Sequence, residues 1–81
     1  MKLTPASINS ALEPLGRHRF DVVGMAVERI KARQYPRGSL GFAAYADVAQ
    51  GHIAHLCRWD VKLTLAQLRA AYALARAILS R

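Results

Sequence analysis

The chain has 81 residues, and its 12 Lys and Arg against 5 Asp and Glu give a formal net charge of +7. This length allows one domain, spanning residues 1–81, with a modest core. The single cysteine, Cys57, excludes an internal disulfide and favours a reducing compartment. No segment has the apolar length that a signal peptide or a membrane span requires. We therefore expect a cytoplasmic domain that does not enter a membrane and whose positive charge favours an anionic partner.

The first predicted element is a short helix that begins after Thr4. Threonine is a favoured N-cap, and Pro5 is well tolerated at the first helical position. Pro14 and Gly16 predict that this helix ends near Glu13, because proline disfavours helix in the residue before it.

The second predicted element is a helix from Phe20 to Gln34, where apolar residues recur at helical spacing. The β-branched pair at 22–23 weakens its beginning, so a strand over residues 19–23 is the alternative there. The run at 35–38, Tyr-Pro-Arg-Gly, is a strong turn signal and should end the helix.

The third predicted element is an amphipathic helix from the N-cap Ser39 to about Cys57. Residues 57–65 then alternate strictly between apolar and polar, a pattern typical of a half-buried strand. An extended connector, a strand paired with residues 19–23 and a continuing helix all fit this segment.

The fourth predicted element is a helix from Leu65 to Leu79, and it has the clearest local signals. Thr64 and Gln67 form a capping-box pattern, and the body is rich in Leu, Ala and Arg, which are strong helix formers. Together these elements predict an all-α bundle of three to four short helices, with a minor extended segment near residues 57–65.

The last helix is apolar on most sides, which is unusual for a helix at the end of a small domain. A stripe of alanines lies beside its main apolar face, and such a stripe lets another helix backbone come close. One interpretation is a packing interface, either a homodimer seam or a docking face for a partner. The other is a central helix wrapped by the rest of the chain. The stripe consists of Ala66, Ala70, Ala73 and Ala77.

The arginines of the second helix form the predicted partner-binding patch. Arg29 and Arg33 lie one turn apart on its outer face, and Arg37 follows just beyond its end. Trp59 and Tyr72 are the predicted anchors, because Trp, Tyr and Arg are enriched at binding hot spots.

A nucleic-acid regulator, also compatible with a dimer, is the alternative. Its phosphate contacts would need several cations on one face. The helix-turn-helix pattern is not satisfied around Gly24 or around Gly51, and aromatic residues do not interleave with the basic ones. The arginines for this alternative are Arg17, Arg19, Arg29, Arg33 and Arg37.

Metal binding and catalysis have little support in the sequence. His52 and His55 can share one edge of a helix, but Cys57 points away from His55, so a tetrahedral site does not follow. The five acidic residues are scattered and form no pair for acid–base work. We expect neither an enzyme nor a cofactor or a metal.

The predicted function is therefore that of a small regulatory protein. It binds a larger protein with an acidic surface and modulates or inhibits it, as stand-alone basic proteins encoded by phages or mobile elements do. Homodimerisation and nucleic-acid binding are the other partner predictions.

Overall fold

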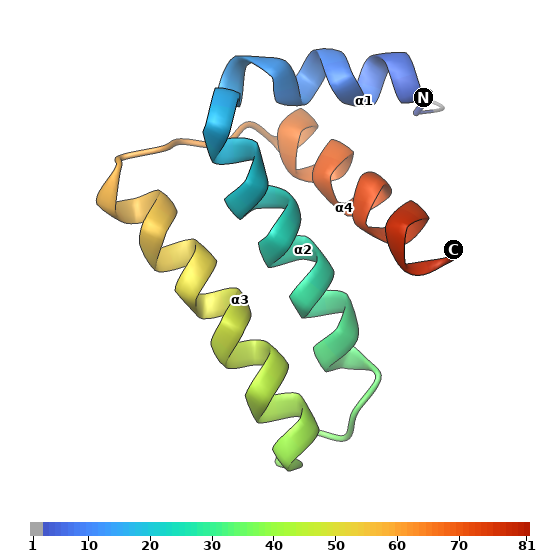
Figure 1. Cartoon of the computed structure of the whole chain (residues 1–81), viewed down its shortest axis with the longest axis vertical. Coiled ribbons are helices and arrows are strands. Elements are labelled where there is room, and N and C mark those ends of the chain that lie inside the picture. Colours follow the sequence, from blue (N-terminus) through green and yellow to red (C-terminus); the bar gives the residue numbers. More distant parts are fainter. Residues whose placement is uncertain (1–2) are drawn as a thin grey trace.

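The computed structural model describes residues 3–81, which form a small all-helical bundle (Figure 1). No strand is present among these residues, so the predicted all-α class is confirmed. The elements in chain order are α1 (Pro5–Leu12), the 3₁₀ helix η1 (Glu13–His18), α2 (Arg19–Arg33), α3 (Leu40–Arg58) and α4 (Leu65–Leu79).

Three of the four α-helices begin at the caps that the sequence predicts. Thr4, Ser39 and Thr64 each accept a hydrogen bond from the backbone three residues on. At α4 the capping box is complete, because the Gln67 side chain also accepts from the Thr64 backbone N–H at 3.0 Å. Each cap satisfies backbone donors that the first helical turn leaves without partners.

The joint between α1 and α2 is the short helix η1. Pro14 starts it, and Gly16 breaks it with a φ of +55°, a conformation that glycine adopts without steric cost. This kink turns the chain so that α1 runs across the top of the bundle, while Leu15 is buried beneath it.

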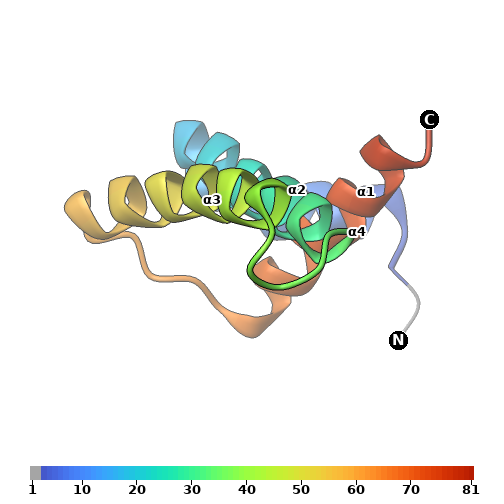
Figure 2. The ribbon, with the colours of Figure 1, turned by 90° about the horizontal axis from the view of Figure 1, so that it is seen from below.

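Helix α2 is the centre of the bundle. It packs against α3 on one side and against α4 on the other, and α1 packs on α4 (Figure 1). The α2–α3 pair is an antiparallel hairpin. Viewed from below, the turn at 34–39 and the connector at 61–64 both protrude on one side of the helices. The C-terminal end of α4 lies on the opposite side (Figure 2). The core consists of Leu12, Leu15, Val22, Met25, Ala26, Ala49, Leu56, Ala70, Ala71 and Ala75.

Within the segment at 57–65, residues 61–64 form an extended connector between α3 and α4, and none of these residues is in a strand. Helix α3 continues to Arg58, and Asp60 then adopts a left-handed φ of 52°. Residues 19–23, the alternative strand partner, are helical. The alternation that suggests a strand still has a structural basis, because Val61 and Leu63 are half-buried and Lys62 is exposed.

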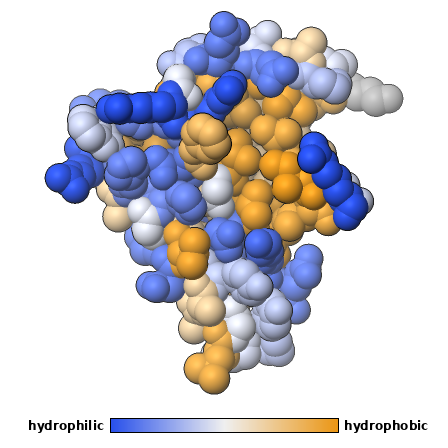
Figure 3. All heavy atoms as spheres, viewed as in Figure 1, coloured by the Kyte–Doolittle hydropathy of each residue, from blue (hydrophilic) through white to orange (hydrophobic). Residues whose placement is uncertain are grey.

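Helix α4 is not enclosed by its own chain. Ala70, Ala71 and Ala75 are fully buried against α1 and α2, but Leu65 is 62% exposed and Ile78 is 38% exposed. Figure 3 shows the resulting apolar surface where α1, α2 and α4 meet. Within residues 3–81, no helix combines the length and the apolar character that crossing a bilayer requires.

Candidate binding site

Three arginines of the predicted patch line one pocket beside the α2–α3 hairpin. Arg29 and Arg33 come from the last two turns of α2, and Arg37 comes from the following turn. The pocket has a volume of about 350 Å³. We call it the arginine pocket, and its other lining residues are Ala32, Tyr35, Phe42, Ala46, Ala49, Gln50 and Ile53.

The turn between α2 and α3 places Arg37 beside the other two arginines. Pro36 cannot continue a helix with regular hydrogen bonds, and Gly38 has a φ of +86°, so the chain reverses at once. The hydroxyl of Ser39 then donates to the Pro36 carbonyl oxygen at 2.7 Å and accepts from the Phe42 N–H at 3.2 Å. This network fixes the point at which α3 begins.

Aromatic contacts stiffen the same end of the hairpin. Tyr35 stacks on Tyr45 with ring centroids 5.6 Å apart, and the Tyr35 ring lies so close to Gly41 that a Cβ there would meet Tyr35 Cδ1 at 2.5 Å. Lys31 Nζ lies 5.5 Å from the centre of the Tyr45 ring. Tyr35, which forms one wall of the arginine pocket, therefore packs against Tyr45 and Gly41 of α3, and Lys31 of α2 in turn lies over Tyr45.

Tyr72 joins α4 to the arginines of α2. Arg29 Nη1 donates to Tyr72 Oη at 3.4 Å, and the Arg33 guanidinium carbon lies 5.9 Å from the Tyr72 ring centre. The structure thus brings together four of the five predicted partner-binding residues, Arg29, Arg33, Arg37 and Tyr72.

The fifth predicted anchor, Trp59, lies elsewhere. It caps the end of α3 and is 52% exposed, with the Arg17 guanidinium carbon 5.2 Å from its ring centre. This places Trp59 at the N-terminal end of α2, whereas the arginine pocket lies at the C-terminal end. The two groups cannot form one small contact surface.

None of the pocket arginines is paired with a carboxylate. In residues 3–81 the contacts within 4.0 Å between cationic and acidic side chains are those of Lys31 with Glu28 and of Asp21 with two histidines. The three arginines that line the pocket therefore have no protein carboxylate within 4.0 Å to balance their charge, and such an arrangement attracts an external anion.

The predicted alanine stripe is divided between two environments. Ala70 is fully buried by the chain itself and Ala73 is half-buried, whereas Ala66 and Ala77 are exposed. A second helix could reach the two outer alanines but not Ala70. The four residues therefore do not present one continuous free stripe.

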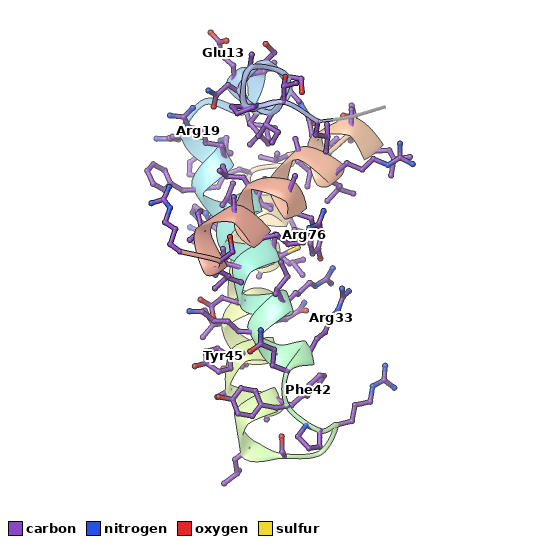
Figure 4. The ribbon with its side chains drawn as sticks, turned by 90° about the vertical axis from the view of Figure 1, so that its right-hand side faces the viewer. Glu13, Arg19, Arg33, Phe42, Tyr45 and Arg76 are labelled. Carbon is purple, nitrogen blue, oxygen red and sulfur yellow. The ribbon has the colours of Figure 1, made fainter. Side chains whose placement is uncertain are left out.

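The five arginines of the nucleic-acid alternative also separate. Arg17 lies over Trp59, and Arg19 lines a different groove together with Phe20. In Figure 4, Arg33 and Arg76 lie on one side of the helices and Arg19 on the other. The alternative set is therefore not one phosphate-binding face.

The polar cluster at the other end of the hairpin was not predicted from the sequence. His52 Nδ1–H donates to Asp21 Oδ1 at 2.9 Å, and His55 Nδ1–H donates to Asp21 Oδ2 at 2.5 Å. A carboxylate can only accept, so in its neutral form His55 carries its proton on Nδ1 and accepts from Trp59 Nε1–H at Nε2, 3.2 Å away. The i, i+3 spacing of the histidines indicates a shared edge, but their partner is 31 and 34 residues away.

The same contacts set the ionisation of Asp21. Burial by itself raises the pKa of this carboxyl group, but the hydrogen bonds from His52 and His55, together with the positive charge that these histidines carry when protonated, outweigh it, so the pKa lies below its ordinary value. The cluster joins α2 to α3 and directs both Nδ1 atoms at Asp21. Cys57 is exposed, and the described residues contain no group of three or more His, Cys, Asp or Glu side chains arranged so that it could hold a metal ion.

Comparisons of this chain with protein-family models, with characterised proteins and with solved structures gave no significant match.

Proposed function

We propose that this chain is a binding protein that docks on an acidic segment of a larger protein through the arginine pocket and thereby modulates that protein. The single observation that carries the proposal is the convergence of Arg29, Arg33 and Arg37 on one pocket with no carboxylate beside them. Guanidinium groups bind carboxylates with two parallel hydrogen bonds, which gives both affinity and orientation.

The floor of the pocket favours a peptide over a nucleic-acid backbone. Phe42, Ala46 and Ile53 of α3 supply apolar surface beside the arginines. An acidic segment that carries one apolar side chain would place its carboxylates on the guanidinium groups and its apolar group on this floor. A sugar–phosphate backbone has no group that would gain from the same floor.

The hairpin geometry supports the same choice. A helix-turn-helix protein sets its two helices at a large angle, so that the second one enters the major groove. Here α2 and α3 are antiparallel and in contact along their length (Figure 1). Neither projects as a recognition helix.

The proposal is tested by measuring the affinity of a short synthetic peptide that contains several glutamates and one phenylalanine. We expect salt-dependent binding by the native chain and about a tenfold loss with Arg33→Glu, equivalent to about 1.4 kcal/mol. Arg58→Glu is the matched control, because it makes the same charge change at an exposed residue that does not line the pocket.

Equal losses in the two variants would contradict the proposal, since only overall charge would then matter. Tighter binding to random duplex DNA than to the peptide, with a steep dependence of affinity on salt, would support the nucleic-acid alternative instead.

A further inference from the structure

A second groove on the surface is also bordered by arginines, and it lies between α1 and α4. Its volume is about 790 Å³, larger than that of the arginine pocket. Leu3, Leu65 and Leu68 give it an apolar lining, and Leu65 is 62% exposed. We call this hollow the α1–α4 groove.

The charges at this groove are all positive. Arg69 and Arg76 both line it, and no Asp or Glu does. They are seven residues apart, or about two helical turns, so their Cα atoms are separated by about 10.5 Å along the axis of α4. Neither has a carboxylate within 4.0 Å among residues 3–81.

From this pattern we infer that the α1–α4 groove seats an amphipathic helix of an acidic partner protein. The apolar face of that helix would cover Leu65 and Leu68. Carboxylates seven residues apart on the same helix have the spacing of Arg69 and Arg76, since both helices have the same rise per residue. The inference rests on the proposed function only in taking the partner to be an acidic protein.

The charge of the groove argues against a second copy of this chain as the occupant. Each copy carries a formal net charge of +7, and the basic residues of α4 have no acidic residue on the same helix to offset them. Two α4 helices in one seam would bring Arg69 and Arg76 close to the same residues of the partner copy. An acidic helix removes this repulsion.

Tyr72 connects the groove to the arginine pocket. Its ring lines the groove, and its hydroxyl accepts from Arg29 of the pocket. One partner with a helix followed by an acidic segment could therefore contact both sites. Figure 4 shows Arg33 of the pocket and Arg76 of the groove on the same side of the molecule.

The test uses a synthetic peptide of about 15 residues, a length at which a helix can form on binding. One face carries leucines at helical spacing, and two glutamates seven residues apart flank that face. We expect this peptide to bind the native chain and to shift the amide resonances of α4. We expect the charge-reversed double variant Arg69→Glu/Arg76→Glu to bind it at least about tenfold more weakly.

Charge exchange makes the test specific. A second peptide, with lysines in place of the two glutamates, should bind the double variant better than it binds the native chain. Arg58→Glu/Arg81→Glu is the control double variant, since these exposed residues do not line the groove. Equal effects of the two double variants, or no recovery with the lysine peptide, would overturn the inference.

Other outcomes separate this inference from the proposed function. If Arg33→Glu weakens the short acidic peptide but the groove variant leaves the helical peptide unaffected, the groove inference fails and the proposed function stands. If Arg69→Glu/Arg76→Glu weakens binding of the helical peptide but Arg33→Glu leaves binding of the short acidic peptide unchanged, the groove inference stands and the proposed use of the arginine pocket fails. A dimer in light scattering that Leu65→Lys dissociates would place a second copy in the groove and overturn the inference.

Discussion

The two neighbours of α2 are held to it by different kinds of contact. Against α3, a polar clasp of Asp21 with two histidines lies near one end of α2, and the His52 ring packs against Gly24. Against α4, the contacts are apolar and rich in alanine, with Ala70, Ala71 and Ala75 completely buried. The hydrogen bond from Arg29 to Tyr72 lies at the exposed margin.

This difference has a consequence for stability. Beside the buried Ala49 and Leu56 of α3, the α2–α3 interface includes groups whose charge changes with pH and whose hydrogen bonds favour one register. The α2–α4 interface depends on buried apolar area, which pH does not alter. Substitutions on the two sides of α2 should therefore differ in size and in pH dependence.

The largest expected effect is on the apolar side. Leu12→Ala should lower the free energy of unfolding by about 2–5 kcal/mol, because it empties a fully packed position in the core shared by α1 and α4. Denaturant unfolding followed by circular dichroism measures this loss. Leu40→Ala is the control, since Leu40 is 90% exposed and its truncation should change little. A similar loss in both variants would contradict the assigned core.

The next effect is on the hairpin side. At Gly24 a Cβ atom would meet His52 Nε2 at 2.7 Å, and Asp21 holds that ring in place. Gly24→Leu should therefore cost about 1–3 kcal/mol by overpacking, despite the better helix propensity of leucine. His52→Ala in the same chain should recover part of the loss. A double-mutant cycle with no coupling between the two positions would refute the close approach.

The clasp also predicts a loss of stability in acid. Because the pKa of Asp21 is lower in the folded chain than its ordinary value of 3.8, its contribution is fully present above that value and disappears as the pH falls below it, through the folded-state pKa. Asp21→Asn should cost about 1 kcal/mol near neutral pH and flatten the acid limb of the stability curve. An unchanged acid limb would show that the clasp contributes nothing.

The smallest effect is expected on the solvent side of α3. Gly51 is in the middle of this helix, and a Cβ there would meet no atom within 4 Å. Gly51→Ala should raise the free energy of unfolding by up to about 1 kcal/mol through helix propensity alone. Gly41→Ala is the contrast, because the Tyr35 ring occupies the space that its Cβ needs. Stabilisation by both substitutions would argue against the packing of Tyr35.

Local sequence signals predicted the helices well, because caps and breakers act over a few residues. Thr64 and Gln67 fixed the start of α4, and the stop signal at 35–38 fixed the turn after α2. The gathering of Arg29, Arg33 and Arg37 was also predictable, since they are four residues apart along one helix and its following turn.

Contacts between distant segments were not predictable in this way. Nothing near Asp21 in the chain indicates His52 or His55, and nothing near Tyr72 indicates the arginines of α2. The alternation at 57–65 predicted an extended connector or a strand, and the connector is what the structure has, because half-burial of every second side chain, as at Val61 and Leu63, does not require a paired strand. Which of the alanines at 66–77 are buried and which are exposed could not be predicted from the sequence, because it depends on where α1 packs on α4.

Trp59 is the only tryptophan of the chain, and it stands where the end of α3 meets η1. The Arg17 guanidinium lies over its ring, and His55 accepts its indole N–H. Tryptophan emission, excited at the red edge of absorption where the three tyrosines do not absorb, therefore originates at a single known junction. This emission reports whether α2 and α3 separate at this end of the hairpin. Because Trp59 is remote from the arginine pocket, titrations of a ligand into the pocket need a dye attached near the pocket.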